Sequence, residues 1–230
     1  MLRIGLLGGM SWESTAEYYR VINEMVRDRL GGLHSADCLL RSVDFAPIEE
    51  LQAKGLWEEA GAALAAAAVE LERGGAELLV LCTNTMHKVA PAIERAVSIP
   101  FLSVIDETAR AVTATGTTTV GLLGTAFTME QDFYRDGLAA HGLEVLTPNP
   151  DDRAIVHRVI YEELCLGIIS NESRKEYQRI IARLASRGAE GVILGCTELE
   201  LLISQHDADI ALYPTTSIHA QAAVDAALAG

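Results

Sequence analysis

The chain has 230 residues, half of them hydrophobic, and carries a formal net charge of −14 at pH 7. This length can bury one large or two small cores, and the acidity argues against binding nucleic acid, since phosphate contacts need clustered Lys and Arg. The longest charge-free apolar run, residues 62–69, is too short to span a bilayer, so we expect no membrane association.

The cysteines and the N-terminus indicate the compartment. Cys38, Cys82, Cys165 and Cys196 are scattered without a close pair. The N-terminus has neither a long apolar region nor a clean cleavage site, so it is interpreted as a first strand and not as an export signal. Thiols are expected in such a chain, and disulfides are not. We therefore expect a cytoplasmic protein.

Strands and helices alternate along the chain. In the first half, the pattern predicts strands at 3–8, 38–45 and 78–81, and helices at 14–30 and 57–73. The second half repeats this order, with strands near 119–123, 143–146 and 191–194 and helices near 128–141, 151–166, 172–186 and 221–228. The run 78–81 is apolar throughout, which is typical of a strand buried on both faces. We predict an α/β fold with parallel sheets flanked by helices.

A motif that occurs in both halves indicates an internal duplication. Residues 75–85 read GAELLVLCTNT, and residues 188–198 read GAEGVILGCTE. A shift of 113 residues places Cys196 on Thr83, and further matches occur upstream and downstream at offsets of 116 and 111. This period is far longer than a solenoid repeat. We predict two similar domains, residues 1–98 with 208–230 and residues 99–207.

Four predicted strands end in glycine-rich or polar turns, near residues 8–11, 82–85, 124–125 and 196–198. In open parallel sheets, ligands bind at the carboxyl ends of the strands. If the two halves face one another, these turns converge on one cleft, and helix N-termini there can hold a carboxylate or phosphate. The first turn, GLLGGM, does not match G-x-G-x-x-G, so it is interpreted as a tight strand-to-helix turn and not as a nucleotide loop.

Among the cysteines, Cys196 is the candidate for chemistry. It stands at a strand-to-helix junction, where the helix dipole favours the thiolate. Cys82 falls one position earlier in its strand, which turns its side chain to the other face, so we assign it to the core together with Cys38 and Cys165.

Other ionisable residues are given structural roles. The six histidines show no pairing at metal-ligand spacing, and we predict no metal site. His87 lies near the Thr83 turn and is interpreted as a helix-surface residue. Glu77 and Glu190 start their strands, opposite the expected site, and are predicted to be structural.

Two equivalent strand ends suit a reaction with two faces, such as inversion at a carbon beside a carboxylate. One group removes the proton from one side, and another delivers a proton to the other. A thiol suits this because its pKa of about 8.5 can be tuned towards neutrality. The carbanion needs preorganised donors, and Lys and Arg are scarce here. The expected donors are Asn84, Thr85, Thr125, Thr128 and Thr197.

Three segments resemble the aspartate/glutamate racemase family, which needs no pyridoxal phosphate: IGLLGGMSWEST at 4–15, CTNTMH at 82–87 and GCTEL at 195–199. The resemblance covers nearly the whole chain. It implies two similar α/β domains related by a pseudo-twofold axis, with a small amino-acid substrate between them. It also implies a homodimer and no cofactor.

The resemblance also implies roles for individual residues. Typical members carry a first catalytic cysteine where this chain has Thr83, and Cys196 matches the second. Cys165 stands where some aspartate racemases have a lysine, which leaves the substrate side-chain preference open. Substrate-binding positions are implied at Met10, Gln52, Asn84, Thr85, Thr125, Thr128, Thr197 and Glu198.

The sequence thus predicts a cofactor-independent racemase of aspartate- or glutamate-type amino acids. Cys196 would remove the α-proton of the L form, and Thr83 would protonate the opposite face. Two alternatives stay open, a one-cysteine decarboxylase of substituted malonates and a non-catalytic binding protein for dicarboxylic amino acids. Maleate isomerases and hydantoin racemases are relatives whose motifs fit less well.

Overall fold

The computed structural model describes the whole chain, Met1–Gly230, and divides it into two compact units. Unit 1 contains Met1–Val104 and His219–Gly230, and unit 2 contains Ile105–Ile218. No helix combines the length and the apolar character needed to cross a bilayer. The domain ranges expected from the sequence, 1–98 with 208–230 and 99–207, stay a prediction.

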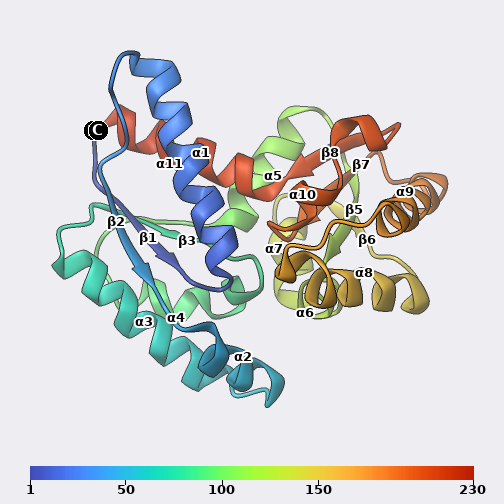
Figure 1. The fold of residues 1–230 in the computed structure, drawn as a ribbon, viewed down its shortest axis with the longest axis horizontal. Coiled ribbons are helices and arrows are strands. Elements are labelled where there is room, and N and C mark those ends of the chain that lie inside the picture. Colours follow the sequence, from blue (N-terminus) through green and yellow to red (C-terminus); the bar gives the residue numbers. More distant parts are fainter. The chain divides into compact units, whose positions relative to one another are not determined.

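Unit 1 is built on a four-stranded parallel sheet in the order β2-β1-β3-β4 (Figure 1). Its strands are β1 (Ile4–Gly8), β2 (Cys38–Ser42), β3 (Leu78–Leu81) and β4 (Phe101–Leu102). Helices α1 (Trp12–Leu30) and α11 (Thr215–Ala229) cover one face. Helices α2 (Phe45–Ala53), α3 (Trp57–Arg73) and α4 (Ala90–Glu94) cover the other.

The central strand β3 is buried on both faces, as its apolar run predicts. Leu79 and Leu81 pack in the core under α3, whereas Leu78, Val80 and Cys82 pack in the core under α1 and α11. Successive side chains of a strand alternate between faces, so both layers depend on this one segment. The end of β3, where Thr83 follows, is therefore held by core packing on both faces of the sheet.

Unit 2 repeats this plan with the parallel order β6-β5-β7-β8. Its strands are β5 (Thr119–Gly124), β6 (Glu144–Leu146), β7 (Gly191–Gly195) and β8 (Ala211–Pro214). Its helices are α5 (Val104–Ala114), α6 (Ala126–Glu130), α7 (Asp132–Ala139), α8 (Pro150–Glu162), α9 (Asn171–Ser186) and α10 (Leu199–Leu202). The predicted α/β fold with two similar parallel sheets is confirmed.

Equivalent contacts support the duplication. The carboxylate of Glu77 accepts a hydrogen bond from the Arg3 amide at the start of β1 (2.9 Å). In unit 2, Glu190 accepts from the Thr118 amide at the start of β5 (2.7 Å). Each glutamate therefore ties its strand to the neighbouring one, which confirms the structural role predicted for both.

Some helix boundaries differ from those predicted. Helix α1 begins at Trp12, because Ser11 caps it by accepting from the Ser14 amide (3.2 Å). The preceding turn needs Gly9, whose φ is 97° and whose Cβ would meet the Val43 carbonyl at 2.2 Å. The segment predicted as one helix at 128–141 forms two, α6 and α7, because Gln131 is extended.

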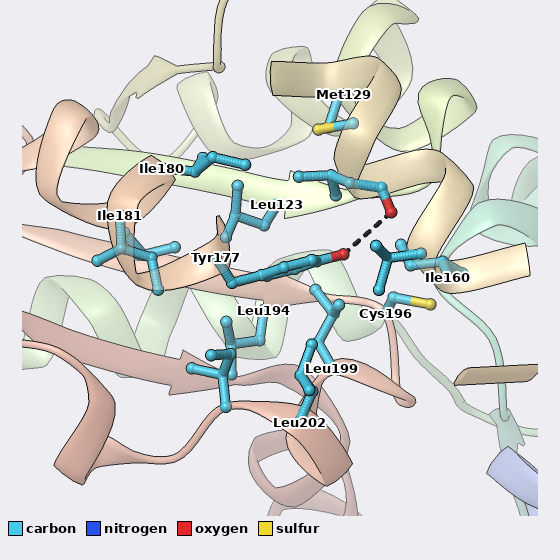
Figure 2. Packing of buried hydrophobic residues seen from close by; sticks show 14 of the residues in the cluster. Leu123, Met129, Ile160, Tyr177, Ile180, Ile181, Leu194, Cys196, Leu199 and Leu202 are labelled. Atoms are coloured by element: carbon cyan, nitrogen blue, oxygen red, sulfur yellow. Dashed lines mark hydrogen bonds between the residues drawn. The ribbon is translucent and has the colours of Figure 1, made fainter. Parts of the chain in front are cut away.

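The core of unit 2 centres on Tyr177 of α9 (Figure 2). Its ring lies between Leu123 of β5 and Leu194 of β7, and its hydroxyl donates to the Val156 carbonyl of α8 (3.0 Å). Burial raises the pKa of this phenol well above its ordinary value. Cys196 lies at the margin of the same cluster, directly after β7. The backbone of Cys196 is therefore held in place by the packed core of unit 2.

Candidate active site

The residues predicted for the site lie at the carboxyl end of the sheet within their own unit. In unit 1, Met10 follows β1, Gln52 lies in α2 after β2, and residues 83–85 follow β3. In unit 2, Thr125 and Thr128 follow β5, and residues 196–198 follow β7. All ten side chains are buried.

The turn after β3 is held by main-chain and imidazole contacts. The Thr83 amide donates to the Leu81 carbonyl (2.9 Å), and the His87 amide donates to the Asn84 carbonyl (3.1 Å). The Nδ1 atom of His87 lies 2.7 Å from the Thr83 carbonyl oxygen. His87 is 4% exposed and contacts this turn, so its interpretation as a helix-surface residue is wrong.

Gln52 presents a buried acceptor near this turn. Its Nε2 atom lies 2.7 Å from the sulfur of Met86, in the 3-10 helix Thr85–Val89. Its Oε1 atom is buried and has no hydrogen-bond partner. A buried polar atom without a partner is costly, and a bound ammonium or amide group would satisfy it. This fits the predicted substrate contact.

Thr125 and Thr128 form the turn after β5. The Thr125 hydroxyl caps α6 by accepting from the Thr128 amide, and the two hydroxyl oxygens lie 3.3 Å apart. The next amide, that of Ala126, donates to Nδ1 of His157 (3.2 Å). Burial lowers the pKa of His157, which suits this acceptor role. The turn is thus ordered by its own two hydroxyl groups and by His157 of α8.

Cys196 is paired with a carboxylate. Its thiol donates to Oε2 of Glu198 (3.0 Å), and the Cys165 thiol lies 3.8 Å from Oε1 of the same group. Burial, and then the negative charge of Glu198, raise the pKa of Cys196 well above its ordinary value. The expectation that a helix dipole favours the thiolate is therefore wrong, since α10 has only four residues and begins three positions later.

The other cysteines separate into core and site. Cys82 is fully buried under α1 and α11, as predicted, and burial raises the pKa of its thiol. Cys38 is partly buried, and burial raises its pKa to about 11. Cys165, in the 3-10 helix Leu164–Leu166, is partly buried and packs against the core of unit 2, while its thiol lies beside Glu198.

The sequence analysis misjudged His87 and did not single out Glu200, and each lies four positions after a predicted catalytic residue. The Val104 amide donates to Nε2 of His87 (3.0 Å), and the Thr216 amide donates to Oε1 of Glu200 (3.0 Å). The shift of 113 residues aligns His87 with Glu200. The repeat already shows that His87 and Glu200 are equivalent positions, and this equivalence could have identified both residues from the sequence. No group of His, Cys, Asp or Glu side chains is arranged to hold a metal ion.

Comparison with known proteins gives consistent matches. A family model described as Asp/Glu/Hydantoin racemase matches residues 7–223. The broad specificity amino-acid racemase RacX of Bacillus subtilis (strain 168) is 24% identical over 230 residues, 98% of each chain. PH1733, an aspartate racemase homologue from Pyrococcus horikoshii OT3, has a similar structure, with a TM-score of 0.88 and 37% identity over 99% of this chain and 100% of that one. A Yersinia pestis protein provisionally assigned as an Asp/Glu racemase reaches a TM-score of 0.93 and 55% identity, with the same coverage.

Proposed function

Because the chain belongs to the Asp/Glu/Hydantoin racemase family, we propose that it racemises aspartate- and glutamate-type amino acids without a cofactor. Cys196 removes the α-proton of the L form, and Thr83 protonates the opposite face of the carbanion. The observation that carries this proposal is the buried pair of Cys196 with Glu198. A thiol hydrogen-bonded to a carboxylate suits proton transfer, because the proton can move between the sulfur of Cys196 and the oxygen of Glu198.

The pair explains how a thiol with a raised pKa can act as a base. The Cys196 proton moves to Glu198, which leaves a thiolate without adding a second negative charge to the buried site. The thiolate then takes the substrate α-proton. The carbanion receives the hydroxyl proton of Thr83 on its other face, and the resulting alkoxide regains a proton from water. The extra proton on Glu198 is released to water, which restores the thiol and the carboxylate.

The substrate carboxylate gains negative charge as the carbanion forms, so it needs preorganised donors. We assign this role to Asn84, Thr85 and Thr197, which lie at the two strand ends. The unpartnered Oε1 of Gln52 is assigned to the substrate ammonium. These assignments need no cationic side chain, in keeping with the net charge of −14.

Thermodynamics limits how one-sided the reaction can be. Free enantiomers have equal free energy, so kcat/KM must be equal in the two directions. The poorly basic Thr83 hydroxyl slows racemisation both ways. Exchange of the L-form α-proton with solvent needs Cys196 alone and can therefore be faster than racemisation.

Proton NMR in D2O tests the proposal. L-Aspartate and L-glutamate are expected to lose the α-proton signal faster than they racemise, and faster than the D forms lose theirs. Cys196→Ser should reduce L-form exchange by about 10²–10⁴-fold, the usual contribution of a general base. Equal exchange of both enantiomers would contradict the asymmetry, and a fully active Cys196→Ser variant would contradict the assignment of the base.

The single thiol also fits a decarboxylase of substituted malonates, in which loss of CO2 makes the carbanion and Cys196 protonates it. Release of CO2 from substituted malonates, without α-proton exchange of amino acids, would decide for this alternative. Tight binding of aspartate with neither reaction would identify a binding protein. A panel of amino acids in the same exchange assay reports the side-chain preference, which Cys165 leaves open.

A further inference from the structure

We propose that His87 is a positioning residue for Thr83. It holds the main chain of Thr83 so that the hydroxyl meets the carbanion, and it thereby governs reprotonation on that side and not abstraction by Cys196. The inference deepens the proposed function and rests on the roles assigned there to Thr83 and Cys196.

The two contacts of His87 fix its protonation state. The Thr83 carbonyl, 2.7 Å from Nδ1, can only accept a hydrogen bond. The Val104 amide, 3.0 Å from Nε2, can only donate one. Both bonds form only in the neutral ring with its proton on Nδ1. The imidazole therefore works as a donor towards Thr83 and as an acceptor towards Val104.

This arrangement controls the direction of the Thr83 side chain. The peptide group before its Cα is held by the bond from the Thr83 amide to the Leu81 carbonyl (2.9 Å). The peptide group after its Cα is held by the His87 imidazole. With both neighbouring peptide groups fixed, the bond from Cα to Cβ has one direction. Loss of the imidazole bond frees one of the two constraints.

The ring of His87 is itself confined. The Phe101 ring packs against it at 5.6 Å between centroids, and the His219 ring packs edge-on at 5.9 Å. His219 is held in turn by the Tyr18 hydroxyl at Nδ1 (2.9 Å) and the Leu102 carbonyl at Nε2 (3.0 Å). All these residues belong to unit 1, so the imidazole cannot swing away from Thr83 without displacing this cluster.

Glu200, the residue equivalent to His87 in unit 2, does not donate a hydrogen bond to the carbonyl of Cys196 as His87 does to that of Thr83. Glu200 accepts from the Thr216 amide, as His87 accepts from Val104, and its second oxygen accepts from the Ser217 hydroxyl (2.9 Å). A carboxylate cannot donate to a carbonyl. The Cys196 carbonyl instead accepts from the Leu199 amide (3.1 Å). The chain therefore places a side chain that both donates and accepts only on the Thr83 side.

Two substitutions of His87 test its hydrogen bond to the Thr83 carbonyl separately from its hydrogen bond with the Val104 amide. His87→Asn places an amide nitrogen near the position of Nδ1 and can still donate to the Thr83 carbonyl. His87→Gln places its amide near Nε2 and loses that donor. We expect His87→Asn to racemise close to the wild-type rate. His87→Gln should lose racemisation on the order of 10²-fold, the effect of a catalytic group displaced by about 1 Å.

The distinguishing readout is the exchange of the L-form α-proton in D2O. This rate depends on Cys196 and should stay close to wild type in both His87 variants, so the ratio of exchange to racemisation rises only in His87→Gln. His219→Gln is the matched control, since it removes a ring that packs on His87 but leaves both hydrogen bonds of His87 in place. It should raise the ratio far less than His87→Gln does. Loss of both rates by the same factor in folded His87→Gln would overturn the proposal.

Nitrogen-15 NMR of the imidazole gives a readout that does not depend on racemase activity. The expected signature is a neutral His87 ring with its proton on Nδ1 at pH 7. A proton on Nε2 would overturn the inference. An enzyme with neither exchange nor racemisation would contradict the proposed function, while this spectrum would still decide whether His87 holds Thr83.

Discussion

The two side chains proposed to handle the α-proton differ in acidity and in support. Cys196 shares its proton with Glu198, whereas Thr83 has an alcohol group whose direction depends on His87. A thiol is a far better base than an alcohol near neutral pH. The slow step of racemisation is therefore expected on the Thr83 side.

Thr83→Cys should raise racemisation in both directions by the same factor, about 10²–10⁴-fold, because it supplies a second general base. The measurement is kcat/KM from each enantiomer by polarimetry. Thr83→Ser is the control, since it keeps an alcohol and should stay near the wild-type rate. Acceleration from one enantiomer only would show that the assay does not report racemisation.

Glu198→Gln should make L-form exchange depend on pH through the neutral range. The variant loses the acceptor that takes the Cys196 proton, so it needs a free thiolate. Below the Cys196 pKa, its rate should fall about tenfold per pH unit. The wild-type pair already holds its negative charge and should show a flat profile there. A flat profile in both enzymes would contradict proton sharing within the pair.

At the residue scale, the motifs supplied the candidate site residues, which stay a prediction, but not their electrostatics. Thr83 and Cys196 could be paired because a repeat shows equivalent positions. The raised pKa of Cys196 could not be predicted, since it depends on burial and on the bond to Glu198. His87 was misassigned because a short 3-10 helix packed against β4 leaves no apolar periodicity to read.

Helices α8 and α9 support β7 through the ring of Tyr177 (Figure 2). Tyr177→Phe keeps the ring and removes only the bond to the Val156 carbonyl, so it should lower the free energy of unfolding by about 1 kcal/mol. Tyr177→Ala empties the core and should cost about 3–5 kcal/mol. Urea unfolding measures both. Equal losses in the two variants would contradict the dominance of packing over the hydroxyl bond.

At the element scale, apolar periodicity predicted α3 and α9 closely, but it missed the start of α11. That helix begins at Thr215, because the Thr215 hydroxyl bonds the Leu194 carbonyl (2.8 Å) and Glu200 binds the Thr216 amide. These polar residues carry no apolar stripe and are buried only by tertiary contacts. Local pattern cannot reveal a helix start that a distant strand determines.

The stability of the whole molecule should depend on pH through His219. Burial, and then the neighbouring His87, lower its pKa to about 3. The unfolded chain binds this proton below about pH 6.5 and the folded chain does not until about pH 3. The folded state is therefore destabilised as pH falls through this window, by roughly 1 kcal/mol per pH unit. Above pH 6.5 the group should have no effect.

The measurement is urea unfolding of wild type and His219→Gln between pH 4 and 8. The variant should lose stability less steeply than wild type as the pH falls, because it has no proton to gain there. Parallel curves would show that His219 does not carry the dependence. His157, whose pKa is also lowered, titrates with the same sign and remains in both proteins.

At the scale of the molecule, the repeat predicted two similar domains with parallel sheets, and the structure contains two parallel sheets of equivalent strand order. It did not predict at which residue the chain passes from one unit to the other, because the covering of a sheet face depends on the path of the chain after each last strand.

Helix α5 follows β4 of unit 1 yet belongs to unit 2 from Ile105 onward, and α11 follows β8 of unit 2 yet packs from His219 onward on unit 1. Each half of the sequence therefore contributes its last helix to the other unit. A chain cut between the repeats would leave Tyr18 without Ala220, Ala223 and Val224, which complete its core. Neither half of the sequence contains all the helices of its own unit, so each unit is completed by residues from the other half.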